Sequence, residues 1–171
     1  MDALPPSLRR RVAAARVARF STLGEDGPAI VPICFVLREG TLYHVLDRKP
    51  KRVEPAALRR VRNLARDPRC AAIVDQYDED WGRLWFVAFE GRARLLTAGA
   101  ERQAAVLALK RKYAQYRRMA LEPDAIVIAL DVGRTRFWQA TPRRPGARPA
   151  TARVDRSGST RSRSTDRRSG H

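Results

Sequence analysis

The segment AIVPICFVL, residues 29–37, restricts the fold of this chain more than any other feature. Nearly all of its residues are apolar, so it lacks the apolar–polar alternation of a strand with one solvent-facing side. A strand of this kind needs cover on both faces. One face would line the interior of a barrel, and the other would pack against helices or a second subunit. We therefore expect a homodimer.

Five further segments contain the β-branched and aromatic residues typical of strands. The six predicted strands span residues 19–23, 28–38, 41–47, 69–77, 83–97 and 125–140. The turns GEDG and EG join the first three strands closely, which predicts an antiparallel meander. Gly91, inside the fifth strand, predicts a bulge or bend where the sheet curls. The predicted fold class is mainly β (α+β), a six-stranded antiparallel barrel with flanking helices.

Three amphipathic segments predict helices at the corners of this barrel. The first spans residues 8–20 and has Ser7 as its expected N-cap. The second begins with Pro55, a residue suited to the first turn of a helix, and ends before Pro68. The third spans residues 99–119.

The chain divides into one predicted domain, residues 1–141, and a tail of different composition. Residues 142–171 are rich in Arg, Ser, Thr, Pro and Gly and have almost no apolar side chains. Such a segment cannot offset its ordering entropy, so we predict that it is disordered. Its nine Arg residues contribute to a net charge of +17, which favours anionic partners. Since 31 of the 35 basic residues are Arg, codon bias in a GC-rich genome explains part of this composition.

The cysteines and the first residues of the chain indicate the cellular location. Cys34 and Cys70 lie in separate apolar runs without CxxC spacing, which favours reduced, buried thiols over a disulfide. The opening MDALPPSLRR has no apolar signal-peptide core, and no segment is long enough to span a bilayer. We expect a cytoplasmic protein with no membrane partner.

The stretch LDRKPKRVEPAALRRVRNLARDPR, residues 46–69, places many basic side chains in a loop and in the helix after it. Its candidate ligand-binding side chains are Arg48, Lys49, Lys51, Arg52, Arg59 and Asn63. Their guanidinium, ammonium and amide donors suit phosphate and carboxylate oxygens. The helix N-terminus adds a favourable dipole for an anion. Two interpretations remain open: an anion-binding site, or a solvated helix face in an Arg-rich protein.

Three motifs carry a family resemblance: TLYHVLDRKPKR (41–52), RNLARDPR (62–69) and VDQYDEDWGRLWFV (74–87). With the order of the predicted elements, they resemble the FMN-binding split-barrel superfamily. Within it, they resemble the pyridoxamine 5'-phosphate oxidase class of F420-dependent oxidoreductases, which use a deazaflavin. The similarity covers residues 8–138 and leaves the basic tail outside.

The resemblance implies a homodimer with two cofactor sites between the subunits. The cofactor ring would lie against the second and third strands, with its phosphate on the basic residues that follow them. The cofactor-binding residues implied are Pro32, Ile33, Cys34, Lys49, Lys51, Arg52, Arg59, Asn63 and Trp138. The first three would offer backbone edges to the ring. Trp138 would lie over the dimer cleft, unless it is an ordinary tryptophan at the barrel end.

Charge favours coenzyme F420 as the cofactor, with FMN as the alternative. F420 carries a phosphodiester and a tail of glutamate carboxylates, whereas FMN carries one phosphate. Cations spread over a loop and a helix suit the longer anion. The implied activity is hydride transfer between reduced F420 and a small unsaturated or carbonyl-type substrate, in which the cofactor supplies the chemistry.

No residue is assigned to catalysis, and no hydrolase or nucleotide-binding motif is present. Candidate proton donors are Tyr43, Tyr77 and Tyr113. Aromatic residues that belong either to the core or to a substrate pocket are Phe20, Trp85 and Trp138. We expect His44 to be packed rather than a base or ligand. The acidic run at 75–80 predicts a polar turn beside basic neighbours rather than a metal site.

Two alternatives from other classes remain. The same barrel could bind FMN or heme without turnover. The chain could also bind nucleic acid non-specifically through its basic tail, because such binding depends on phosphate contacts. The body lacks an RRM-type aromatic pair and a helix-turn-helix pattern, which weighs against specific nucleic-acid recognition.

Overall fold

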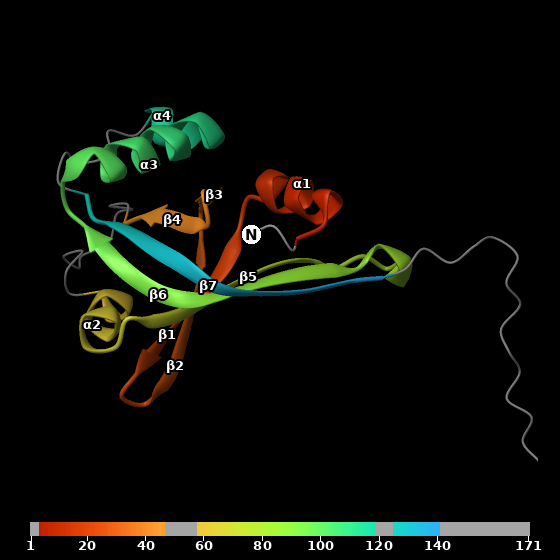
Figure 1. Ribbon diagram of the computed structural model, residues 1–171, viewed down its shortest axis with the longest axis horizontal. Helices are drawn as coiled ribbons and strands as arrows, with labels where there is room; N and C mark the ends of the chain where they lie inside the picture. Colours follow the sequence, from red (N-terminus) through yellow and green to blue (C-terminus); the bar gives the residue numbers. More distant parts are fainter. Residues whose placement is uncertain (1–3, 47–57, 119–124, 141–171) are drawn as a thin grey trace, which may run out of the picture.

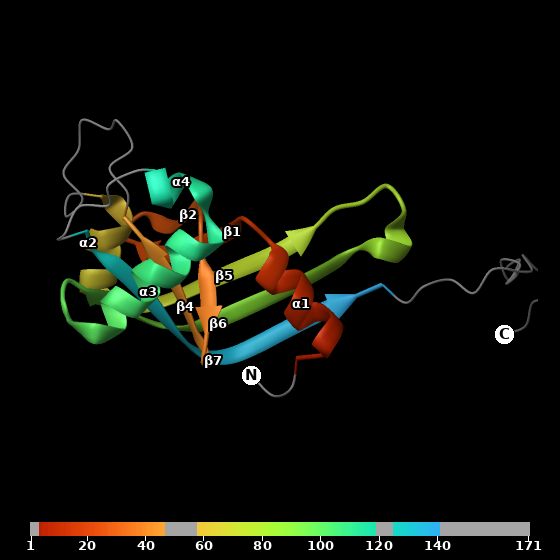
Figure 2. The same cartoon turned by 90° about the horizontal axis from the view of Figure 1, so that it is seen from above.

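The computed structural model describes residues 4–46, 58–118 and 125–140. Within these ranges, one seven-stranded antiparallel sheet curls around an apolar core, with helices packed against it (Figures 1 and 2). In chain order the elements are α1 (Pro6–Ala14), β1 (Ala18–Gly24), β2 (Gly27–Ile33), β3 (Val36–Arg38), β4 (Thr41–Val45), α2 (Arg59–Arg66), β5 (Arg69–Gln76), η2 (Trp81–Arg83), β6 (Trp85–Leu96), α3 (Gly99–Lys112), α4 (Ala114–Arg118) and β7 (Val127–Gln139).

The order of strands shows that the sheet closes on itself. The strands lie in the order β2-β1-β5-β6-β7-β4-β3, so β2 and β3 are the two edges. Only Cys34 and Phe35 separate these strands in the chain, and the two edges must therefore come together. Figure 1 shows the β1–β2 and β3–β4 hairpins on opposite sides of the long β6–β7 ribbon. This is a split β-barrel, as predicted.

Two predictions about the first strands are wrong. The single strand expected at 28–38 is two strands, which raises the number of strands in the described residues from six to seven. The first three predicted strands form no meander, because β2 and β3 lie at opposite edges. At the break, the Tyr113 hydroxyl lies 2.9 Å from both the amide nitrogen and the carbonyl oxygen of Phe35. A side chain from the junction of α3 and α4, far away in the sequence, thus replaces strand pairing at Phe35.

Large apolar side chains fill the barrel interior. Four strands contribute Phe20, Leu42, Phe89 and Leu130. Helix α1 adds Leu8 and Val12 to the same cluster, and α2 adds Leu64. Both helices are short, so their stability depends mainly on packing this apolar face against the barrel.

The outer side of the sheet has one covered part and one uncovered part. Helices α3 and α4 cover β3, β4 and the beginning of β7, where Leu109 and Tyr116 pack against Val127. On β1, β2 and the far end of β7, large apolar side chains stay exposed: Ile30 is 66% exposed and Trp138 is 49% exposed. The predicted cover by helices is confirmed only for the first part. For the second, a partner subunit remains a prediction.

Several predicted helix boundaries differ from the structure. Helix α1 follows Pro5, so Ser7 lies inside its first turn and is not the N-cap. The helix ends at Ala14 rather than Phe20, because Phe20 pairs in β1 and is fully buried. Helix α2 ends before Pro68, as predicted, whereas Pro55 lies outside the described residues. The predicted helix at 99–119 is divided at Tyr113 into α3 and α4.

A bulge lies beside Gly91, as predicted, but its extra residue is Gly133 in β7, which has no paired residue in β6. The register between β6 and β7 shifts between Glu90 and Gly91. A Cβ atom at Gly91 would lie 1.9 Å from the carbonyl oxygen of Asp131, so no other residue fits without moving the backbone. The tail at 142–171 lies outside the described residues, so its disorder and the domain boundary at 141 stay predictions.

Candidate cofactor site

The predicted phosphate-binding run lies in a part of the chain for which only the flanks are described. Lys49, Lys51 and Arg52 fall within residues 47–57, outside the described ranges. Leu46, just after β4, is buried in the interior cluster, and Leu58, just before α2, packs against that cluster. The described residues on either side of this segment therefore belong to the packed barrel.

Helix α2 presents arginines beside the tip of the β1–β2 hairpin. Its apolar side carries Val61 and Leu64, and helical spacing places positions 59, 62, 63 and 66 on the other side, where Asn63 is also buried. They line part of an open hollow of about 190 Å³, called here the α2 hollow, whose lining residues are Glu25, Asp26, Arg59, Arg62, Asn63 and Arg66. The structure thus brings together Arg59 and Asn63, two of the predicted site residues.

The charges in the α2 hollow are only partly balanced. Arg66 forms an ion pair with Glu25 at 3.0 Å and donates a hydrogen bond to the Leu23 carbonyl. Within the described residues, neither Arg59 nor Arg62 forms an ion pair with an acidic side chain. Two guanidinium groups are therefore available for phosphate or carboxylate oxygens.

Asn63 has a structural contact that the sequence does not reveal. Its side chain is only 8% exposed, and its amide nitrogen donates a hydrogen bond to the Thr22 hydroxyl at 2.9 Å. This bond joins α2 to β1 through two buried polar groups. An amide nitrogen has two hydrogens, so the second remains for a ligand. The predicted cofactor role of Asn63 is compatible with this geometry and remains a prediction.

Pro32, Ile33 and Cys34 lie at the end of an edge strand. Pro32 and Ile33 close β2, which pairs on one side with β1 through Arg19 and Ala18. Since β2 is a sheet edge in the described residues, its other side has backbone groups that no strand uses. Pro32 can offer only a carbonyl, because it has no N–H. Cys34 is half-buried in the connection to β3.

Trp138 lies far from the α2 hollow within one chain. Thr22, beside the hollow, pairs with Cys70, which pairs with Gly91 and through it with Val132. Trp138 is six residues further along β7, roughly 20 Å in an extended strand. Figure 1 shows this end of the β6–β7 ribbon pointing away from α2. One subunit therefore does not bring Trp138 and Arg59 into one site.

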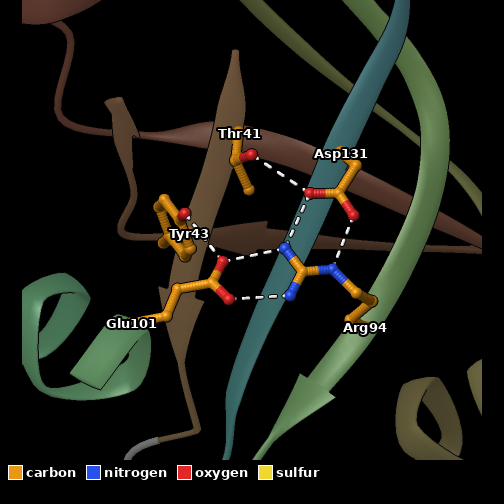
Figure 3. A network of polar contacts seen from close by, with 5 residues as sticks. All are labelled: Thr41, Tyr43, Arg94, Glu101 and Asp131. Atoms are coloured by element: carbon orange, nitrogen blue, oxygen red, sulfur yellow. Dashed lines mark hydrogen bonds and ion pairs between the residues drawn. The ribbon is translucent and has the colours of Figure 1, made fainter. Parts of the chain in front are cut away.

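A network around Arg94 was not anticipated from the sequence (Figure 3). The Arg94 guanidinium donates to Asp131 at 2.6 and 2.9 Å and to both Glu101 oxygens at 2.8 Å. Tyr43 donates to Glu101, and Thr41 donates to Asp131. Hydrogen bonds from Arg94 lower the pKa of both carboxylates. The network ties α3 to β4, β6 and β7, and no local sequence pattern indicates it.

The candidate proton donors differ in their surroundings. Burial, and then the hydrogen bond to Glu101, raise the pKa of Tyr43. Burial raises the pKa of Tyr113 to about 12, and its hydroxyl is held between Arg16 and Phe35. Tyr77 is exposed. Two of the three hydroxyls are thus committed to the fold.

The other polar and aromatic candidates are packed in the core or form ion pairs within the fold. Phe20 and Trp85 are core residues. His44 is fully buried, and burial, followed by repulsion from Arg60, lowers its pKa to about 3, so it is neutral near pH 7. The polar turn predicted at 75–80 is confirmed only for residues 77–80, which connect β5 to η2 and where Asp80 pairs with Arg83. Asp75 lies in β5 and pairs with Arg19.

Two further properties concern only the described residues. No group of three His, Cys, Asp or Glu side chains is arranged there to hold a metal ion. In the same ranges, no helix is both long and apolar enough to cross a membrane.

Comparison with known proteins places the split barrel in a family. The family model described as pyridoxamine 5'-phosphate oxidase matches residues 4–139. The chain belongs to this family. No curated protein matches the chain closely.

Solved structures share the fold at low sequence identity. A conserved hypothetical protein from Mycobacterium tuberculosis has a TM-score of 0.64 and 19% identity, over 80% of this chain and 86% of that one. A heme-binding protein from Mycobacterium smegmatis has a TM-score of 0.62 and 24% identity, over 77% and 52%. A putative pyridoxamine 5'-phosphate oxidase from Listeria innocua has a TM-score of 0.56 and 17% identity, over 77% and 98%.

Proposed function

We propose that the protein is an F420-dependent oxidoreductase that transfers a hydride between reduced F420 and a small unsaturated or carbonyl-type substrate. One observation carries the choice of cofactor. In the α2 hollow, Arg59 and Arg62 have no acidic partner among the described residues, and the hollow adjoins the basic run 48–52 in sequence. An anion with several separated charges uses such a distribution better than a single phosphate does.

The proposed site lies between two subunits. The uncovered outer face of β1, β2 and the end of β7 exposes Ile30 and Trp138, and apolar surface of this kind favours association. A second chain could place its Trp138 near the first chain's cofactor, which one chain alone does not do. This supports the predicted homodimer and the predicted role of Trp138.

In this proposal the protein binds and orients, and the cofactor supplies the hydride when bound. Lys49, Lys51, Arg52 and Arg59 hold anionic groups, and the unpaired edge of β2 near Pro32 positions the ring. Holding the ring and the substrate in contact lowers the barrier by orientation, and closing the site excludes water. No proton donor is assigned, because the Tyr43 and Tyr113 hydroxyls already have partners in the fold.

FMN is the second candidate cofactor, and heme is a third. The family match supports FMN, and a structural neighbour described as a heme-binding protein supports heme. The chain has two histidines, His44 and His171. His44 is fully buried in the barrel, so it cannot reach a heme iron without rearrangement. This favours a flavin-type cofactor over a heme ligated by His44.

Titrating the purified protein with F420, FMN and heme tests the proposal. We expect tight F420 binding, weakened at least tenfold by Lys51→Ala combined with Arg52→Ala, since each charge-assisted contact contributes roughly 1.5–3 kcal/mol. The matched control is Arg111→Ala, an exposed arginine on α3. Binding of FMN alone would overturn the cofactor choice. Retained F420 binding without turnover of any enone, quinone or tetrapyrrole acceptor would remove the enzyme assignment.

A further inference from the structure

A second basic site lies where the barrel closes, away from the α2 hollow. Lys112 is the last residue of α3, and its ammonium nitrogen lies 4.1 Å from the centre of the Phe35 ring and 5.6 Å from the centre of the Tyr113 ring. The Arg16 guanidinium lies 5.6 Å from the centre of the same Tyr113 ring. Two cations thus share an aromatic floor formed by Phe35 and Tyr113.

Hydrogen bonds hold the residues of this site together. The Tyr113 hydroxyl contacts the Phe35 backbone and lies 2.8 Å from the Arg16 carbonyl oxygen, and Arg16 itself donates a hydrogen bond to the Lys112 carbonyl. These contacts connect the end of α3 to the β2–β3 connection and to the segment between α1 and β1. The site is therefore held by three separate parts of the chain.

The charges of this site are not neutralised by the protein. Within the described residues, no acidic side chain forms an ion pair with Lys112 or Arg16. Burial, and then repulsion from Arg16, lower the pKa of Lys112 to about 8. The other titratable groups facing it are Cys34 and Tyr113. Aromatic faces offset part of the cost of burying the ammonium, but they do not supply a counter-charge.

We propose that Lys112 and Arg16 bind the anionic group of a small-molecule ligand, a carboxylate or a phosphate, over the Phe35–Tyr113 floor. An anion between them would convert repulsion into two attractive, charge-assisted contacts. The site adjoins Cys34, which the resemblance assigns to the cofactor ring. That the anion belongs to the substrate rests on the proposed function, whereas the existence of the site does not.

Reactivity of Lys112 gives a test that needs no cofactor. The full chain is methylated with formaldehyde and a borane reductant, two uncharged reagents, from pH 6 to 10. The extent of methylation at each lysine is then measured by mass spectrometry. Sodium sulfate stands for phosphate, sodium acetate stands for carboxylate, and sodium chloride at matched ionic strength is the reference. Only the neutral amine reacts, so the pH profile reports the protonation of Lys112.

In chloride we expect half-maximal reactivity of Lys112 near pH 8. An anion bound to the ammonium favours its protonated form, and a pKa raised by about one unit slows methylation at pH 8 about fivefold. Lys110, on the same helix, is the matched control and should keep its rate. A larger effect of sulfate would indicate a phosphate, and a larger effect of acetate would indicate a carboxylate.

Two variants make the test specific. Arg16→Met should abolish the effect of the anion on Lys112, and Arg16→Lys should keep part of it, because the charge remains. Identical Lys112 profiles in all three salts would overturn the proposal, as would an effect that persists unchanged in Arg16→Met. Neither result would bear on F420 binding at the α2 hollow, which is measured separately by titration.

Discussion

At the scale of single residues, buried polar side chains join elements of the fold and influence its stability. Tyr113 replaces strand pairing at Phe35, and Asn63 joins α2 to β1 through Thr22. His44 has no hydrogen-bond partner for its Nε2 atom among the described residues. A buried polar atom without a partner costs free energy, and a charge there costs more. His44 is therefore held in its neutral form.

This state of His44 predicts a loss of stability at mildly acidic pH. The pKa of His44 is about 3 in the folded chain and ordinarily 6.5, so below pH 6.5 the unfolded chain binds a proton that the folded chain does not. The free energy of unfolding should fall as the pH drops, by at most about 1.4 kcal/mol per unit from this group. Urea unfolding between pH 6.5 and 5 measures the slope.

The control for this prediction is His44→Leu, which removes the titrating group and keeps an apolar side chain in the core. Its unfolding free energy should change less with pH over the same interval. Asp67, Glu101 and Asp131 have lowered pKa values, so their contribution is lost only below about pH 4.5, outside this window. An equal slope in the variant and the parent chain would contradict the assignment.

At the scale of elements, the local sequence pattern predicts most strands and turns, whereas tertiary contacts set some of their boundaries. The strands predicted at 69–77 and 83–97 are found as β5 and β6 with slightly shorter bounds. The β1–β2 hairpin and the end of α2 before Pro68 are also confirmed, and all of these follow from residue type and turn chemistry. The end of α1 and the division of the strand at 28–38 do not. Both depend on residues far away in the sequence, which bury Phe20 and form hydrogen bonds with Phe35. A local sequence pattern does not contain this information.

The β6–β7 bulge provides a prediction with a matched control. Gly91→Ala should destabilise the protein by roughly 3 kcal/mol or more, because its Cβ would overlap the Asp131 carbonyl and force the backbone apart. Gly133→Ala is the control, since a Cβ there meets nothing closer than 3.8 Å. Thermal or urea unfolding measures both. Similar losses in the two variants would show that the close approach at Gly91 is not the cause.

At the scale of the whole molecule, the uncovered outer face predicts a dimer. Ile30→Asp combined with Trp138→Asp should shift the protein to monomers, because each change places a charge in the proposed apolar interface. Sedimentation measures the change, and we expect at least a hundredfold weaker association. Leu107→Asp, at an exposed position on α3, should leave association unchanged. A parent chain that is monomeric at micromolar concentration would contradict the prediction.

The candidate site was predictable only in part. The cationic character of residues 48–66 is evident in the sequence, and the structure places Arg59 and Asn63 on one side of α2 as helical spacing predicts. The contribution of Glu25 and Asp26 to the α2 hollow required the β1–β2 hairpin to fold toward the helix. Lys49, Lys51 and Arg52 lie outside the described residues, so their role stays a prediction.

Residue type and spacing alone predict a strand-rich fold, a basic loop and helix, and the bulge at Gly91. Three sequence motifs carry the family resemblance. These depend on neighbours in the chain, where period and turn chemistry act. Only the tertiary structure decided that β2 and β3 become opposite edges, that Tyr113 binds Phe35, and that Arg94 gathers Glu101 and Asp131. Those outcomes depend on side chains up to 78 positions apart meeting in a closed barrel, and short-range pattern carries no information on such meetings.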